Sequence, residues 1–159
     1  EILLFGSIST NWLPSCWPPS VLPPPSPVES ARNLGIRFDL ALSFRSQVLS
    51  NTGFCFVLLK SIRTFLYILP LDARKTVIQA LITSRLDYAN VLYLRLLIRL
   101  ISKLQTVQNT AVGLLLNIPG RAHITPHLCT LHWLPVKERI LFKALVIVHR
   151  AIMDWVPSI

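Results

Sequence analysis

The chain has 159 residues, a length that fits one domain with its own core. Its hydrophobic fraction of 52% and mean hydropathy of +0.54 are high for a soluble protein of this size. A net charge of +9, from 16 Lys and Arg against 7 acidic residues, favours nucleic acid or an anionic surface as partner. Eleven of these bases are Arg, which suits bidentate phosphate contacts. Three widely spaced cysteines argue against a disulfide framework.

A membrane-spanning helix is excluded by the distribution of charge. Such a helix needs ~20 nearly uncharged apolar residues. The two most apolar runs, residues 54–69 and 91–101, are cut by Lys60 and Arg63, and by Arg95 and Arg99, respectively. Residues 1–8 lack the basic start of a signal peptide. We therefore expect an intracellular protein, located in the nucleus or cytoplasm.

The first forty residues, 1–40, predict a β-hairpin with a long connection. Residues 1–6 form a short apolar run that suits a buried strand, and residues 33–39 alternate apolar and polar, which predicts a second strand. Between them, the loop at residues 12–31 includes seven prolines, which favour an extended polyproline-like conformation. One Pro-x-x-Pro match, Pro24 to Pro27, lacks the nearby basic residue that SH3 ligands need, so a linker is favoured.

Helical spacing begins at Ser43, and residues 43–159 predict a mainly α domain of four to five helices. Ser43 is expected to cap a first helix that runs to about Leu69, with an interruption near residues 51–53 and a stop at Pro70. Asp72 is expected to cap a second helix, whose apolar side consists of Val77, Leu81, Ile82 and Leu86.

The later helices have the clearest patterns. The third has apolar residues at three- and four-residue steps and ends at Pro119: Leu97, Leu100, Ile101, Leu104, Val107, Ala111, Leu114 and Leu115. Thr125 is expected to cap a short turn with Pro126 at its first position. Pro135 opens a last helix to about Asp154, whose predicted apolar side is Ile140, Leu141, Ala144, Leu145, Ile147, Val148 and Ile152.

Residues for catalysis or metal binding are not clustered in the sequence. Nucleotidyl transfer needs grouped carboxylates that hold two divalent ions, and the aspartates here are isolated. His123, His127, Cys129 and His132 are potential zinc ligands, but the Cys-x₂₋₄-Cys pair of structural sites is missing. We favour a packing corner beside Trp133 over a metal site. We predict no catalytic residue, metal site or cofactor in this chain.

Basic residues are the functional signal that the residues themselves provide. Six of them are predicted to lie on helices, off the apolar stripes, where they can track phosphates: Arg85, Arg99, Lys103, Lys137, Lys143 and Arg150. A solvated helical face is the alternative interpretation for each of them taken singly.

Four sequence blocks carry a resemblance to a known family. They are Ser84-Arg85-Leu86-Asp87-Tyr88, Leu104-Gln105-x-Val107-Gln108-Asn109, His123-Ile124-Thr125-Pro126 and Leu131-His132-Trp133-Leu134-Pro135-Val136. In order and spacing they resemble the C-terminal, post-palm part of the reverse transcriptase of a non-LTR (LINE-type) retrotransposon. The resemblance covers almost the whole chain. It implies that residues 1–40 hold a primer-grip remnant, with Asn33, Leu34 and Gly35 as primer-grip-like residues, and that residues 43–159 form the thumb.

The implied role is to hold an RNA template paired with a DNA primer while the palm synthesises DNA. In that family the palm uses Mg²⁺ and an Asp-Asp box, which would lie upstream of Glu1. The resemblance thus implies a truncated, non-catalytic segment whose partners are the RNA–DNA template-primer and the missing palm. The alternatives are a helical module that docks on a protein or an anionic membrane surface, and a non-functional relic.

The chain departs from the family pattern in its seven-proline loop, which is unlike a tidy hairpin, and at two places in the helical part. The family has a Gly-Leu-Pro break where this chain has Arg95-Leu96-Leu97, which predicts that the turn between two thumb helices is lost. After Asn109 the family tends to have small residues and then Arg, a plausible phosphate contact that is absent here. Gly113 stands in this region and costs about 1 kcal/mol of helix stability relative to Ala.

Overall fold

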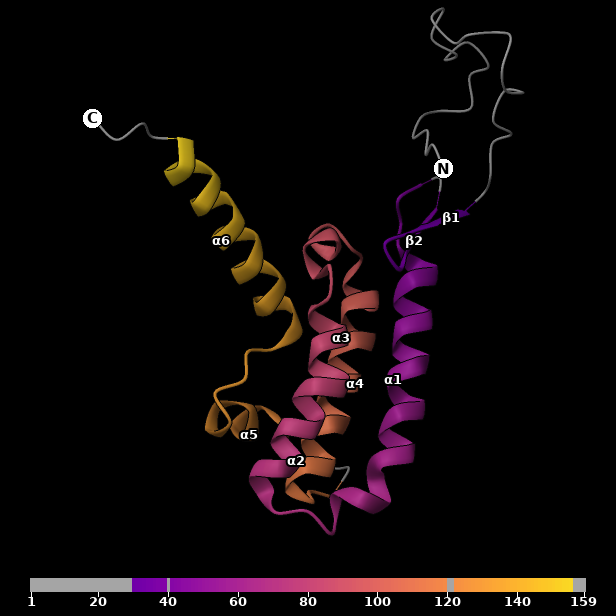
Figure 1. The fold of residues 1–159 in the computed structure, drawn as a ribbon, viewed down its shortest axis with the longest axis vertical. Helices are drawn as coiled ribbons and strands as arrows, with labels where there is room; N and C mark the ends of the chain where they lie inside the picture. The colour runs from indigo at the N-terminus through magenta and orange to yellow at the C-terminus, as the bar shows by residue number, and fades with distance from the viewer. Residues whose placement is uncertain (1–29, 40, 120–121, 156–159) are drawn as a thin grey trace, which may run out of the picture.

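A computed structural model describes residues 30–39, 41–119 and 122–155 (Figure 1). Within these ranges the chain is mainly α, with a two-stranded hairpin followed by helices. The elements are β1 (Ser30–Asn33), β2 (Ile36–Asp39), α1 (Arg45–Leu66), α2 (Leu71–Ile78), the π-helical turn η1 (Gln79–Thr83), α3 (Ser84–Asp87), the 3₁₀ turn η2 (Asn90–Tyr93), α4 (Ile98–Leu116), α5 (Thr125–Thr130) and α6 (Val136–Trp155). Because α2, η1 and α3 are continuous, the prediction of a hairpin and four to five helices is confirmed.

The hairpin differs from the predicted one. Ser30 pairs with Asp39 and Asn33 with Ile36 in an antiparallel register. Leu34 and Gly35 form the turn, with φ of 48° and 80°, and positive φ at both central residues is typical of tight hairpins. The single strand predicted over 33–39 is therefore wrong, and residues 30 and 31 belong to β1 rather than to a loop. The predicted strand at 1–6 and the prolines of the connection lie outside the described residues.

Helix α1 runs without a break through residues 51–53, where an interruption was predicted. Its buried residues, Val48, Cys55, Leu59 and Leu66, follow steps of seven, four and seven, so one face stays on the core past Gly53. Tertiary packing outweighs the low helix propensity of Gly. The helix ends at Leu66, before Pro70, and Arg74 donates hydrogen bonds to the carbonyls of Leu69 (2.7 Å) and Tyr67 (3.3 Å) just beyond this end.

The start of α1 is fixed by the end of β2. The carboxylate of Asp39 accepts hydrogen bonds from the Ser43 hydroxyl and from the backbone N–H of Phe44, the latter at 3.1 Å. The Ser43 oxygen in turn accepts a long hydrogen bond from the N–H of Arg45 at 3.4 Å. Phe44, rather than Ser43, occupies the cap position, so Ser43 acts together with Asp39.

The second helix contains a register shift that the sequence pattern did not predict. The π-helical turn η1 inserts between α2 and α3, so that Ile78, Ile82 and Leu86 are buried and Leu81 is 37% exposed. Asp72 lies inside the first turn, and Pro70 holds the cap position assigned to it. The predicted apolar side was therefore correct for Ile82 and Leu86, and wrong for Leu81.

The predicted loss of the turn before α4 is also wrong. Ala89 adopts a positive φ of 52°, η2 follows, and Leu97 has extended backbone before α4 begins at Ile98. Tyr93, only 2% exposed, anchors this connection in the core, with its ring 6.3 Å from that of Phe44. Burial of a large aromatic side chain thus maintains the break although Gly and Pro are absent from residues 95–97.

Helices α1 and α4 run side by side and pack against each other (Figure 1). Leu104, Val107, Ala111 and Leu115 of α4 are buried there, as the third-helix pattern predicted, although Leu97 is 72% exposed. In α5, Thr125 is the first helical residue rather than the cap, with Pro126 in the first turn.

Helix α6 packs only through its beginning. Val136, Ile140 and Ala144 are buried, and Figure 1 shows the rest of α6 extending away from the bundle. The other residues of its predicted apolar side are exposed by 51–59%: Leu141, Leu145, Ile147, Val148 and Ile152. Among the described helices, none combines the length and apolar character needed to cross a membrane.

Candidate nucleic-acid interface

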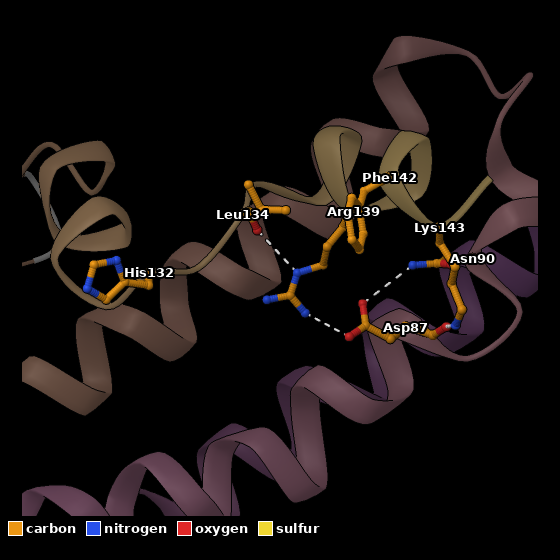
Figure 2. A pocket seen from close by; sticks show the side chains of 7 residues that line it. All are labelled: Asp87, Asn90, His132, Leu134, Arg139, Phe142 and Lys143. Carbon is orange, nitrogen blue, oxygen red and sulfur yellow. Dashed lines mark hydrogen bonds and ion pairs between the residues drawn. The ribbon is translucent and has the colours of Figure 1, made fainter. Parts of the chain in front are cut away.

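Two of the sequence blocks meet around Asp87 (Figure 2). Its carboxylate forms an ion pair with Arg139 of α6 at 2.8 Å and accepts a hydrogen bond from the Asn90 side chain at 3.4 Å. Lys143 donates to the backbone carbonyl of Asp87 at 2.8 Å. These residues line an open pocket of about 390 Å³ with His132, Leu134 and Phe142. Both cations at this pocket, Arg139 and Lys143, are bound to Asp87. The contacts of Asp87 therefore join α3 to α6, and they leave little positive charge available to a ligand.

The residues that were predicted to be primer-grip-like, Asn33, Leu34 and Gly35, form the hairpin turn and the end of the strand before it. The Tyr88 hydroxyl donates to the Leu34 carbonyl at 2.5 Å, which ties this turn to the end of α3. Asn33 ends β1, the side chain of Leu34 is 80% exposed, and Gly35 carries the positive φ of 80°. Tyr88 of the Ser84–Tyr88 block therefore positions the turn in relation to the helices.

A network of amides joins α4 to the start of α6. Gln105 accepts a hydrogen bond from the backbone N–H of Val136 at 2.9 Å, and Gln108 donates to the backbone carbonyl of Leu134 at 2.9 Å. The Gln105 NH₂ group donates to Gln108 at 3.0 Å and to the Asn109 oxygen at 2.8 Å. Both ends of the network are backbone groups of fixed polarity, so the orientation of every amide is determined. The Gln-x-x-Gln-Asn block thus has a packing role.

The six predicted phosphate-contacting cations do not form one surface. The Arg85 guanidinium lies 4.0 Å from the centroid of the Phe54 ring, and Lys143 is bound to Asp87. Lys137 and Arg150 are exposed on α6, about 20 Å apart along its axis at 1.5 Å per residue. Arg99 and Lys103 are exposed four residues apart on α4, where they share a face.

Helix α1 adds two cations to that face. Neither α1 nor α4 contains an Asp or Glu. Lys60 and Arg63 share one stripe of α1, and Thr106 and Thr110 continue the stripe of Arg99 and Lys103. Arg63 of the first stripe and Thr106 and Thr110 of the second line the same pocket, so the two stripes border it from adjacent helices. We call Lys60, Arg63, Arg99 and Lys103 the α1–α4 basic face. Sequence reasoning missed Lys60 and Arg63 because they interrupt an apolar run.

The pocket at the end of this face, the α1–α4 pocket, has a volume of about 840 Å³ and no carboxylate in its lining. Its walls come from the last turns of α1, from α4 and from the connection to α5. Its lining residues are Arg63, Tyr67, Thr106, Asn109, Thr110, Gly113, Leu114, Asn117, Ile118, Pro119, Ala122, His123, Ile124 and Thr125. Its polar groups suit an anion better than a cation.

The His and Cys constellation of the sequence is not assembled. His123 lines the α1–α4 pocket, whereas His132 lines the pocket at Asp87. Over the part of the chain that the structure describes, no three His, Cys, Asp or Glu side chains are grouped as metal ligands.

The buried thiol nearest to the predicted cations is Cys55. Burial raises its pKa above the ordinary 9.0, and the positive charge of Arg85 lowers it by a smaller amount. The thiol therefore stays protonated near neutral pH, which favours a packing role over nucleophilic chemistry.

Comparison with family models, with curated proteins and with solved structures finds no match to this chain.

Proposed function

We propose that the chain is a non-catalytic segment of a non-LTR-type reverse transcriptase that binds a nucleic-acid template-primer through the α1–α4 basic face. The observation that carries the proposal is the gathering of four cations on two adjacent helices that have no carboxylate. Side chains of this kind release counterions when they neutralise phosphates, which drives binding without reading sequence. The resemblance of the sequence blocks supplies the family.

In this proposal, Asp39 and Asp87 stabilise the fold and take no part in polymerase chemistry. Asp39 is held at the start of α1 by Ser43 and Phe44, and Asp87 is paired with Arg139. Chemistry is assigned to a palm with its Mg²⁺ ions, and this segment contributes contact with the template-primer. The exposed part of α6 then serves as packing surface for that palm.

The test of this function is affinity for an RNA–DNA duplex measured over a range of salt concentrations. We expect a steep loss of affinity with salt, close to one power of salt for each phosphate neutralised. Binding no tighter than that of an unrelated protein of equal length and charge would reject the proposal.

A second candidate function is a helical interaction module, and α6 is the observation that favours it. Leu141, Leu145, Val148 and Ile152 follow steps of four, three and four, and each is more than half exposed. Such a stripe docks on a protein surface or on an anionic membrane. Self-association or liposome binding that survives high salt would support this candidate over the first.

A further inference from the structure

The α1–α4 pocket offers one hydrogen-bond donor, the Asn109 amide, whose orientation is set by the rest of the fold. Asn109 accepts from Gln105 through its oxygen at 2.8 Å, and the Gln105 amide is itself oriented by the backbone N–H of Val136. The Asn109 NH₂ group is therefore the one left to the pocket, and no described residue accepts a hydrogen bond from it. At Asn109 the pocket is thus lined by an amide donor rather than by an amide acceptor.

Arg63 brings a full charge to the same lining. Its side chain is exposed, and among the described residues it makes no hydrogen bond or ion pair. A guanidinium and an amide NH₂ are the donor types that bind phosphate oxygens well. Thr106 and Thr110 donate instead to carbonyls within α4, at 2.9 and 2.8 Å, so we assign them no phosphate contact.

Tyr67 supplies an aromatic wall. It follows Arg63 by one helical turn, lines the same pocket and is 45% exposed. Bases of unpaired strands stack on such rings while the backbone follows cations, which needs no sequence readout. A cation, an amide donor and a half-exposed ring in one pocket match the phosphate and the base of a nucleotide.

We propose that the α1–α4 pocket binds one nucleotide unit of an unpaired polynucleotide strand, with the phosphate at Arg63 and Asn109 and the base against Tyr67. This inference rests on the proposed nucleic-acid function and deepens it, because it separates an unpaired-strand contact from the general phosphate attraction of the α1–α4 basic face. In a template-primer, the unpaired template beside the duplex is the strand that fits.

The first test measures protection of Arg63 from phenylglyoxal, followed by mass spectrometry of the modified peptides. AMP, adenosine and inorganic phosphate are compared at equal ionic strength. Arg95, an exposed arginine in the connection before α4, is the matched control. We expect AMP to slow modification of Arg63 several-fold, phosphate to slow it less, adenosine to leave it unchanged, and Arg95 to react equally throughout. Equal protection of Arg63 and Arg95 by AMP would overturn the proposal.

The second test compares Tyr67→Leu with Tyr67→Phe, which keeps the ring, after circular dichroism shows both to be folded. We expect Tyr67→Leu to weaken binding of an oligo(dT) strand about tenfold, and Tyr67→Phe to bind like the parent. Affinity for a blunt duplex should not change in either variant. If both variants bind oligo(dT) like the parent while duplex binding persists, the pocket proposal fails and the proposed function stands. If AMP protects Arg63 but neither oligo(dT) nor the duplex binds, the proposed function fails, and the assignment of the pocket to a polynucleotide strand fails with it.

Discussion

The side chain of Gln105 accepts a hydrogen bond from the backbone N–H of Val136 at 2.9 Å, so α4 holds the first residue of α6. This N–H is one of the donors that a helix N-terminus leaves without an intrahelical partner. Val136 is only 2% exposed, and water therefore cannot replace Gln105 easily. The Leu104–Asn109 and Leu131–Val136 sequence blocks are thus joined by packing contacts.

Replacing Gln105 should cost more stability than replacing its neighbour Gln108. Gln105→Leu leaves the buried N–H of Val136 without a partner, and we expect a loss of about 1–3 kcal/mol. Gln108→Leu removes a donor from the Leu134 carbonyl, which keeps a second donor in Arg139 at 3.2 Å, so we expect about 1 kcal/mol. Urea unfolding of the two variants measures the difference. A larger loss for Gln108→Leu would contradict the network.

The Asp87–Arg139 pair should contribute modestly. Its side chains are 36% and 16% exposed, so solvent screens the charges in part. A double-mutant cycle with Asp87→Asn and Arg139→Gln should give a coupling of about 0.5–1 kcal/mol that shrinks with added salt. Lys143 binds the backbone carbonyl of Asp87, so a cycle with Lys143→Gln should give a smaller value. Equal couplings for the two cations would show that the ion-pair geometry has no special effect.

Acid should weaken the junction between β2 and α1 through Asp39. Partial burial raises the pKa of this carboxyl, but hydrogen bonds from Ser43 and Phe44 outweigh it, so the pKa lies below the ordinary 3.8. A lowered folded pKa stabilises the fold above the unfolded pKa, and this stabilisation is lost as pH falls through the folded value. The measurement compares the melting temperatures of the parent and of Asp39→Asn over a range of pH. We expect the difference between the two melting temperatures to be largest above about pH 5 and to decrease towards zero as pH falls below the unfolded pKa. A difference independent of pH would rule out the charge as its cause.

The two cysteines that the structure describes should differ sharply in reactivity. Cys55 is fully buried with a raised pKa, whereas Cys129 is exposed on α5. Thiolates are the reacting species, so iodoacetamide at pH 7.5 should label Cys129 quickly and Cys55 only after urea unfolds the chain. Peptide mass spectrometry reads both sites in one sample. Equal labelling without urea would place Cys55 outside the core.

Local patterns predicted the helices well, because apolar spacing persists wherever a face is buried. The steps through Leu104, Val107 and Ala111 gave α4, and Pro135 marked the start of α6. The hairpin turn was missed because Leu34 has a positive φ, which leucine rarely adopts. The π-helical turn at 79–83 also has no signal in a periodic pattern.

The site was less predictable than the fold because it depends on contacts between distant residues. Arg139 and Asp87 are 52 positions apart in the sequence, and Lys143 and Asp87 are 56 apart. Local spacing therefore could not predict that Lys143 is hydrogen-bonded within the fold. In the sequence, Lys60 and Arg63 stand as interruptions of the apolar run at residues 54–69. Their three-residue spacing indicates that they share one face of a helix. It indicates a basic surface shared with Arg99 and Lys103 only once α4 is known to lie beside α1.

Salt dependence of RNA–DNA duplex binding in two charge-matched double variants tests the central claim most directly. Arg99→Gln with Lys103→Gln removes half of the α1–α4 basic face, and Lys137→Gln with Arg150→Gln removes the same charge from α6. We predict that the first pair lowers the magnitude of the slope of log affinity against log salt by about two, and that the second pair changes it by much less. Equal slopes for the two double variants would contradict the assignment of the nucleic-acid interface to the α1–α4 basic face.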